Sequence, residues 1–77
     1  MPVVVLLRHC RILMYFEDHN PPHFHVRDHD GREAEILLSD LSVRKGSVGR
    51  RALAEALDYA RGEHDALRER WNDYNPS

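Results

Sequence analysis

The chain has 77 residues, of which 31% are charged, and a formal net charge of -2 at pH 7. A chain of this length predicts one domain, which buries only about 60–65% of its extended surface and therefore has modest stability. The slightly acidic balance argues against binding nucleic acid over a broad surface, although it leaves room for a local basic patch.

Cysteine content and hydropathy indicate where the protein acts. The single cysteine, Cys10, excludes an internal disulfide and favours a reducing compartment. Residues 3–7 form an apolar run that is too short to span a membrane and lacks the basic leader and cleavage site of a signal peptide. The sequence therefore predicts a cytoplasmic protein with one domain over residues 1–77.

Two apolar runs, residues 3–7 and 12–16, predict the arms of a β-hairpin with His9 and Cys10 as the turn. In this register every opposed pair is apolar, as the buried face of a sheet requires. The turn lacks the Asn-Gly or Asp-Gly sequence that two-residue hairpins favour. The predicted pairs are Leu7 with Ile12, Val5 with Met14 and Val3 with Phe16.

A stiff segment follows the first hairpin. Pro21 and Pro22 fix φ in succession and remove two backbone donors, so the segment is neither helical nor in the middle of a sheet. Asn20, which precedes the prolines, is driven toward an extended conformation. The segment would therefore present His19 on one side and lead into a strand that begins at His23.

A second hairpin is predicted from residue 23 to residue 38, with its turn near Gly31. A two-residue turn would place charged side chains beside the core. A three-residue loop with Gly31 in the left-handed conformation instead separates an apolar face from a charged face, so we choose this register. It pairs Phe24 with Ile36, Val26 with Ala34, His25 with Glu35 and Arg27 with Glu33, and it places His23, His25, Arg27, Glu33 and Glu35 on the outer face.

Residues 40–47 predict a loop, and a helix follows from Gly49 to about Asn72. Its apolar residues recur at helical spacing. Gly62 lies off this stripe and would mark a bend or a hinge between two helical pieces. Trp71 and Tyr74 would anchor the helix end on the sheet. The stripe consists of Leu53, Leu57, Ala60, His64, Leu67 and Trp71.

The predicted order is ββββα. It indicates an α+β domain in which a small antiparallel four-stranded sheet, made of two hairpins, is covered on one face by one long C-terminal helix. Leu13 and Tyr15 would lie on the opposite face, which stays partly uncovered. An uncovered sheet face on so small a domain suggests a homodimer or a protein partner.

Three motifs resemble a known family. Residues 19–26 read His-Asn-Pro-Pro-His-Phe-His-Val, residues 34–36 read Ala-Glu-Ile, and residues 71–74 read Trp-Asn-Asp-Tyr. With these motifs the chain resembles, over nearly its whole length, the small bacterial domain of unknown function 4160. That family has a PPH-x-H signature and a closing W-N-x-[HY] motif. The chain departs from that family in its first turn, where glycine is usual, and at Gly49, where serine is common. The resemblance implies that the protein pairs with another protein in a toxin–antitoxin-like or regulatory system. It provides no established activity to transfer to this chain.

A metal site is one hypothesis for the histidines. His23 and His25 leave the same face of a strand about 6–7 Å apart, so both imidazoles can reach one ion. His19 from the stiff segment and Glu35 from the neighbouring strand would complete a set that suits zinc or another divalent metal. The competing interpretation is that His25 and Glu35 are an ordinary cross-strand pair and His19 is solvated.

A metal-free ribonuclease is a second hypothesis. Imidazole gains and loses protons near neutral pH, so His23 and His25 would serve as general base and general acid. Arg27 on the same face would hold the phosphate. The competing interpretation is a solvated charged face.

We prefer a third interpretation from the sequence, a binding module in a toxin–antitoxin-like or regulatory pair. Leu13 and Tyr15 would contact the partner through the uncovered sheet face. A local basic cluster could add contacts to phosphate groups, although a solvated surface is its simpler explanation. The cluster consists of Arg44, Lys45, Arg50 and Arg51.

Overall fold

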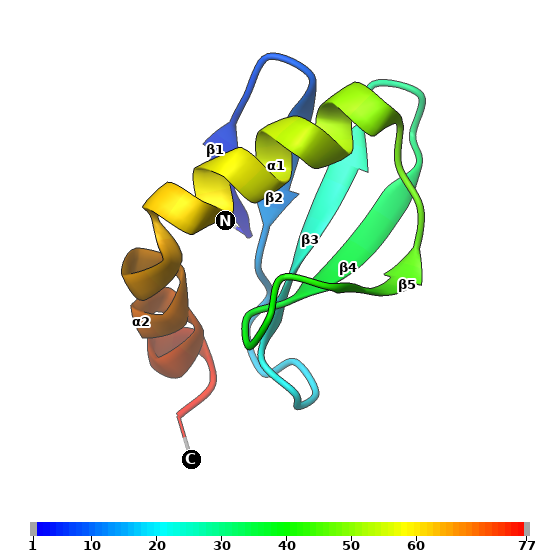
Figure 1. Ribbon diagram of the computed structural model, residues 1–77. Coiled ribbons are helices and arrows are strands. Elements are labelled where there is room, and N and C mark those ends of the chain that lie inside the picture. The colour runs from blue at the N-terminus through cyan, green and yellow to red at the C-terminus, as the bar shows by residue number, and fades with distance from the viewer. Residues whose placement is uncertain (1, 77) are drawn as a thin grey trace.

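The computed structural model describes residues 2–76, which form five strands and two helices (Figure 1). The strands form one antiparallel sheet in sequence order. The α+β class with an antiparallel sheet is therefore confirmed, but the predictions of four strands and one helix are wrong. The elements are β1 (Val3–Leu6), β2 (Cys10–Leu13), β3 (His23–Asp28), β4 (Glu33–Leu37), β5 (Val43–Gly46), α1 (Arg50–Gly62) and α2 (His64–Tyr74).

Helix α1 lies across one face of the sheet, and the core fills the space between them (Figure 1). Three alanines of α1, spaced four residues apart, are buried against the sheet. Their small side chains let the helix approach closely, while Phe24 and Val26 fill the interface from β3. Leu53 and Leu57, which the sequence places on the buried stripe, flank this contact and are half-buried. The alanines are Ala52, Ala56 and Ala60.

The predicted long helix is divided into α1 and α2 directly after Gly62. Glu63 has φ −120° and ψ 26°, values outside the α-helical range. This break redirects the chain, so that α2 lies beside the loop between β2 and β3 (Figure 1). Leu67 and Trp71 of α2 are buried there. The hinge predicted near Gly62 is confirmed, and the prediction of a single continuous helix is wrong. Neither helix within residues 2–76 is long and apolar enough to cross a membrane.

The second hairpin has the predicted register. All four predicted pairs are observed between β3 and β4. Gly31 has φ +82° and occupies the three-residue loop, which the Asp28 N–H closes by donating to the Arg32 carbonyl at 3.0 Å. Phe24 consequently faces α1, and the histidines of β3 point to the opposite face of the sheet.

The first hairpin has a register that differs from the prediction. The Leu7 N–H donates to the Cys10 carbonyl at 2.8 Å, so the turn consists of Arg8 and His9 rather than His9 and Cys10. The observed partners are Val3 with Leu13, Val5 with Ile12 and Leu6 with Arg11, with an irregularity between Val3 and Val5.

A distant carboxylate stabilises this turn. Glu55 of α1 accepts hydrogen bonds from the backbone N–H groups of Arg8 at 3.1 Å and His9 at 2.7 Å. The shifted register buries Cys10 against Ala52. Burial, together with a hydrogen bond to the Glu55 carboxylate, raises the pKa of the Cys10 thiol to about 12, so the thiol stays protonated near neutral pH.

The predicted loop at residues 40–47 contains a fifth strand, β5, which pairs with β4. Leu41 has φ +61° in the tight connection before it. All four residues of β5 are exposed, because the strand forms an edge of the sheet. Its sequence, Val-Arg-Lys-Gly, lacks the alternating apolar residues that would have indicated a strand.

Candidate metal centre

The candidate site lies on the outer face of the sheet, opposite α1. His23 and His25 alternate with core residues along β3 and therefore leave the strand on this face. The loop between β2 and β3 returns over them and brings Asp18 within contact distance.

Hydrogen bonds from backbone N–H groups hold the middle of this loop against the end of α2. The Asp18 N–H donates to Oδ1 of Asn75 at 2.6 Å, and the Glu17 N–H donates to the Tyr74 carbonyl at 3.2 Å. The ring of Phe16 stacks on that of Tyr74, with centroids 4.0 Å apart. The C-terminal end of α2 therefore determines where the Asp18 carboxylate lies.

Three potential ligand atoms converge between the loop and β3. Oδ2 of Asp18 lies 3.1 Å from Nε2 of His23 and 3.3 Å from Nε2 of His25. Oε1 of Glu35 lies 3.6 Å from Nε2 of His23. In a tetrahedral complex with zinc–ligand bonds of about 2.0–2.1 Å, ligand atoms stand about 3.3–3.4 Å apart. The spacings among Asp18, His23 and His25, whose atoms all lie within 4.8 Å of one another, are compatible with one shared ion, whereas Glu35 lies outside that group of three.

The second ring nitrogen of each histidine also contacts an acceptor. Nδ1 of His23 lies 2.8 Å from the Pro21 carbonyl, which only accepts hydrogen bonds, and Nδ1 of His25 lies 3.3 Å from Oε2 of Glu33. His25 thus has a carboxylate at each ring nitrogen, Glu33 at Nδ1 and Asp18 at Nε2. In neutral rings that carry the proton on Nδ1, the lone pairs of both Nε2 atoms face the Asp18 carboxylate. A cation between the nitrogens and the carboxylate, either a proton or a metal ion, would stabilise that arrangement.

Two of the three carboxylates around the histidines, those of Asp18 and Glu33, have a lowered pKa, which favours their ionised form. Burial raises the pKa of Asp18, but the His19 backbone N–H at 2.8 Å, the His25 hydrogen bond and the adjacent imidazoles together lower it below its ordinary value. Burial likewise opposes the ionisation of Glu33, and Arg27 outweighs it, so the pKa of Glu33 is lowered. Arg27 donates to Oε1 of Glu33 from Nε at 3.1 Å and Nη2 at 2.7 Å.

Aromatic rings shield the imidazoles from water. His23 is 2% exposed and His25 is 8% exposed, so the expectation of a solvated charged face is wrong for both. The Trp71 ring lies 5.2 Å from that of His23, and Tyr15 packs edge-on against His25 at 4.7 Å. An ion can approach from the side of Asp18, whose carboxylate is partly exposed.

The structure brings together some of the predicted ligands and replaces another. His23 and His25 converge, with Glu35 beside them. His19 is exposed, and its backbone rather than its ring contacts the cluster. Asp18, which the sequence interpretation did not select, takes that place. The only local signal for it was an acidic residue next to the histidine motif.

The three residues of the predicted catalytic set lie on one sheet face as expected, but Arg27 is paired with a carboxylate. The His23 and His25 rings lie 5.0 Å apart and both face Asp18. Arg27 contacts Glu33, which separates it from His25. The histidines and the arginine thus form a chain of contacts along one sheet face.

The predicted partner-binding residues are divided among several surfaces. Leu13 is buried, and Tyr15 is half-buried on His25, so the uncovered apolar face is not present at these two residues. Of the basic cluster, Arg44 and Lys45 lie on β5, where Nη1 of Arg44 is 3.8 Å from Oε1 of Glu35. Arg50 and Arg51 are exposed at the beginning of α1.

Comparison with known proteins gives one match. A family model described as "Domain of unknown function (DUF4160)" matches residues 10–72. The matched region includes Asp18, His23, His25 and Glu35. No curated protein and no solved structure was found to match.

Proposed function

The chain belongs to the DUF4160 family, whose description names no activity. We therefore propose a function from the site itself. The protein is a divalent-metal-binding module whose ion, with zinc as the best fit, is held by Asp18, His23 and His25, with Glu35 beside His23 as the candidate for a fourth ligand. The observation that carries this proposal is the convergence of two imidazole Nε2 atoms on one carboxylate oxygen.

A metal ion accounts for the geometry better than protons do. One proton would satisfy a single contact between an imidazole and Asp18. Two protons would create two imidazolium ions with ring centroids 5.0 Å apart at a buried position, where their mutual repulsion opposes the attraction of the neighbouring carboxylates. A divalent cation would be coordinated by the lone pairs of His23 and His25 at the same time. The hydrogen bonds from both Nδ1 atoms are of the kind that orient metal-bound histidines.

The ligand types favour zinc over other divalent metals. Two imidazoles and carboxylate oxygens form known zinc sets, and tetrahedral coordination matches the spacings. Two histidines and one carboxylate also bind Fe(II) when coordination positions stay open. Glu35 lies 3.6 Å from Nε2 of His23 and would fill such a position after a shift of its side chain, which would close a zinc site that holds the loop on β3.

This proposal of a metal-binding module differs from the partner-binding module that the sequence analysis favoured. That preference depended on an uncovered apolar face at Leu13 and Tyr15, whose side chains are packed. Pairing with another protein stays a prediction from the family resemblance. Our proposal also places the protein in the cytoplasm, where the thiol of Cys10 would stay reduced.

Calorimetric titration with zinc chloride at pH 7, on protein first treated with a chelator and then freed of it, tests the proposal. We expect one equivalent of zinc to bind. The variants Asp18→Asn and His25→Gln should weaken binding by more than about 100-fold, the upper figure for losing an outer hydrogen-bond partner of a ligand.

Two exposed histidines provide matched controls. His19→Gln and His29→Gln remove the same side-chain type outside the converging atoms, and both should retain the affinity of the unaltered protein. Absence of stoichiometric zinc binding would overturn the proposal. Equal weakening of zinc binding by His19→Gln and His25→Gln would also overturn the proposal, because it would show that His25 is not a specific ligand.

A further inference from the structure

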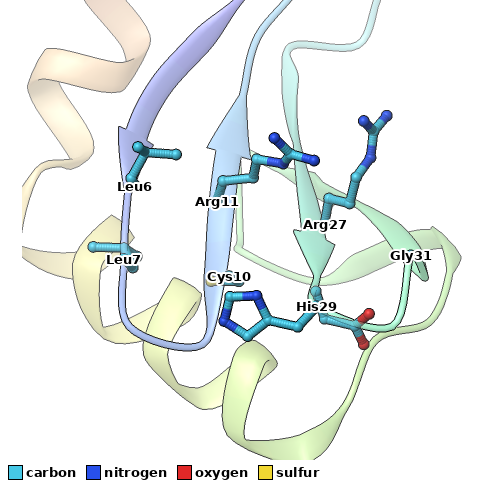
Figure 2. A pocket seen from close by; sticks show the side chains of 8 residues that line it. Leu6, Leu7, Cys10, Arg11, Arg27, His29 and Gly31 are labelled. Carbon is cyan, nitrogen blue, oxygen red and sulfur yellow. The ribbon is translucent and has the colours of Figure 1, made fainter.

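Two arginines lie side by side at the far end of the same sheet face. Arg11 of β2 is directly opposite Arg27 of β3, and the same row continues to Leu6 of β1 and Glu33 of β4. Figure 2 shows both arginine side chains leaving their strands on the same side. They line a hollow of about 440 Å³, within the range of small-molecule sites.

The charges around this hollow leave one guanidinium unbalanced. Like charges directly opposite on neighbouring strands destabilise a sheet. Glu33 balances Arg27 through two hydrogen bonds. Among residues 2–76, no ion pair to Arg11 is present.

Asp28, the acidic residue that lines the hollow, does not balance Arg11. Its Oδ2 accepts from Nε of Arg32 and from the Gly49 N–H, both at 2.9 Å. Its Oδ1 accepts from the N–H groups of Asp30 and Arg32, both at 3.0 Å. The hollow therefore has an excess of positive charge, to which an anion would be attracted.

We propose that this hollow binds the phosphate group of a nucleotide-sized phosphate ester. Two adjacent guanidinium groups provide the planar, paired donors that match phosphate oxygens. Leu6, which is 72% exposed and lies in the same row as the arginines, provides an apolar surface for the carbon-containing part of the ligand. The donors for the phosphate are Arg11 and the guanidinium edge of Arg27 that Glu33 does not use.

This site shares no binding atom with the metal centre, although Glu33 contacts both Arg27 and His25. Arg27 follows His25 by two residues, so the two side chains leave β3 about 6.6 Å apart on one face. The ligand-binding arginines contact none of the three converging atoms of Asp18, His23 and His25. Phosphate binding can therefore be measured on metal-free protein, and its failure would leave the zinc proposal untouched.

Titration of the metal-free protein, in the presence of chelator, with uridine monophosphate and adenosine monophosphate tests the site. We expect binding to each nucleotide that weakens as the salt concentration rises. Arg11→Gln should weaken it about tenfold or more, the loss expected for a hydrogen bond to a charged group. Arg51→Gln, an exposed arginine at the beginning of α1, is the matched control and should leave the affinity unchanged.

Two RNA oligonucleotides distinguish a free nucleotide from the end of a strand. The same short strand is tested with and without a 5′-phosphate. Tighter binding of the phosphorylated strand than of the monophosphates assigns the site to strand ends, and the reverse order assigns it to free nucleotides. Equal affinity of Arg11→Gln and the unaltered protein, or absence of binding to every phosphate ester, would overturn the proposal.

Discussion

At the scale of single residues, hydrogen-bond partners outside the candidate metal centre determine which atoms face into it. Glu33 accepts from Nδ1 of His25, and the Pro21 carbonyl accepts from Nδ1 of His23. When Nδ1 carries the proton in each ring, both contacts leave Nε2 free to bind an ion. Sequence reasoning selected the two histidines because strand alternation fixes their direction. It selected His19 instead of Asp18 because the direction of a loop side chain depends on contacts far along the chain, such as that with Asn75.

Glu33→Gln tests this indirect control of the metal. An amide is a weaker acceptor for the Nδ1 proton and does not balance Arg27, so His25 would be less firmly oriented. We expect zinc affinity to fall about 10–100-fold, with one equivalent still bound. Calorimetry gives both quantities. Glu17→Gln, in the loop but outside these contacts, is the control, and an unchanged affinity in Glu33→Gln would contradict the role.

The pH dependence of stability tests the environment of Asp18. Its pKa in the folded protein is lowered, since the hydrogen bonds and the imidazoles outweigh burial. Ionised Asp18 therefore stabilises the folded, metal-free protein above the ordinary aspartate pKa of about 3.9. This stabilisation is lost as the pH falls from there through the lower folded-state pKa.

Thermal unfolding of metal-free protein between pH 7 and pH 3 measures this contribution. Asp18→Asn should melt at a lower temperature at pH 7, and the difference from the unaltered protein should shrink toward pH 3. Asp58→Asn, on the exposed surface of α1, should lack this pattern. A difference that is constant with pH would show that the Asp18 charge does not stabilise the fold.

At the scale of elements, local patterns predicted those parts of the fold that local contacts stabilise. The β3–β4 register follows from alternating residues and the left-handed Gly31, and both are visible in the sequence. The β1–β2 register depends on Glu55, 46 residues from His9, and was predicted wrongly. β5 was missed because an exposed edge strand has no buried face to impose a hydrophobic pattern.

Trp71→Ala tests the attachment of α2 to the rest of the fold. The indole is 3% exposed and lies against the His23 ring. Its removal should lower the free energy of unfolding by about 3–5 kcal/mol, as for other buried aromatic residues. Urea denaturation measures the change. Glu69→Ala, on the exposed face of α2, is the control, and a loss below about 1 kcal/mol for Trp71→Ala would show that α2 is attached by other contacts.

At the scale of the whole molecule, the candidate centre joins three parts of the chain. Asp18 comes from the β2–β3 loop, the histidines come from β3, and the loop itself is held by α2. A ligand that binds only the folded chain stabilises it, by about 2.7 kcal/mol at a concentration 100 times its dissociation constant. In a domain of this size, each kcal/mol raises the melting temperature by about 4–8 °C.

Zinc should therefore raise the melting temperature by about 10–20 °C under those conditions. Differential scanning calorimetry with and without zinc measures the shift, and excess chelator should reverse it. His25→Gln should show a shift of less than about 2 °C, since it lacks a ligand. A similar shift in both proteins would place zinc elsewhere on the chain.

The attachment of the loop to the end of α2 also has a kinetic consequence. Asp18 and Asn75 are 57 residues apart, so nearly the whole chain must be assembled before the carboxylate reaches the histidines. Closing such distant contacts is expected late in folding, and interactions that are absent from the transition state act on the unfolding rate. Stopped-flow measurements should show that zinc slows unfolding and leaves the folding rate nearly unchanged. The ion would then bind only after the protein has folded, and it would slow unfolding without speeding folding.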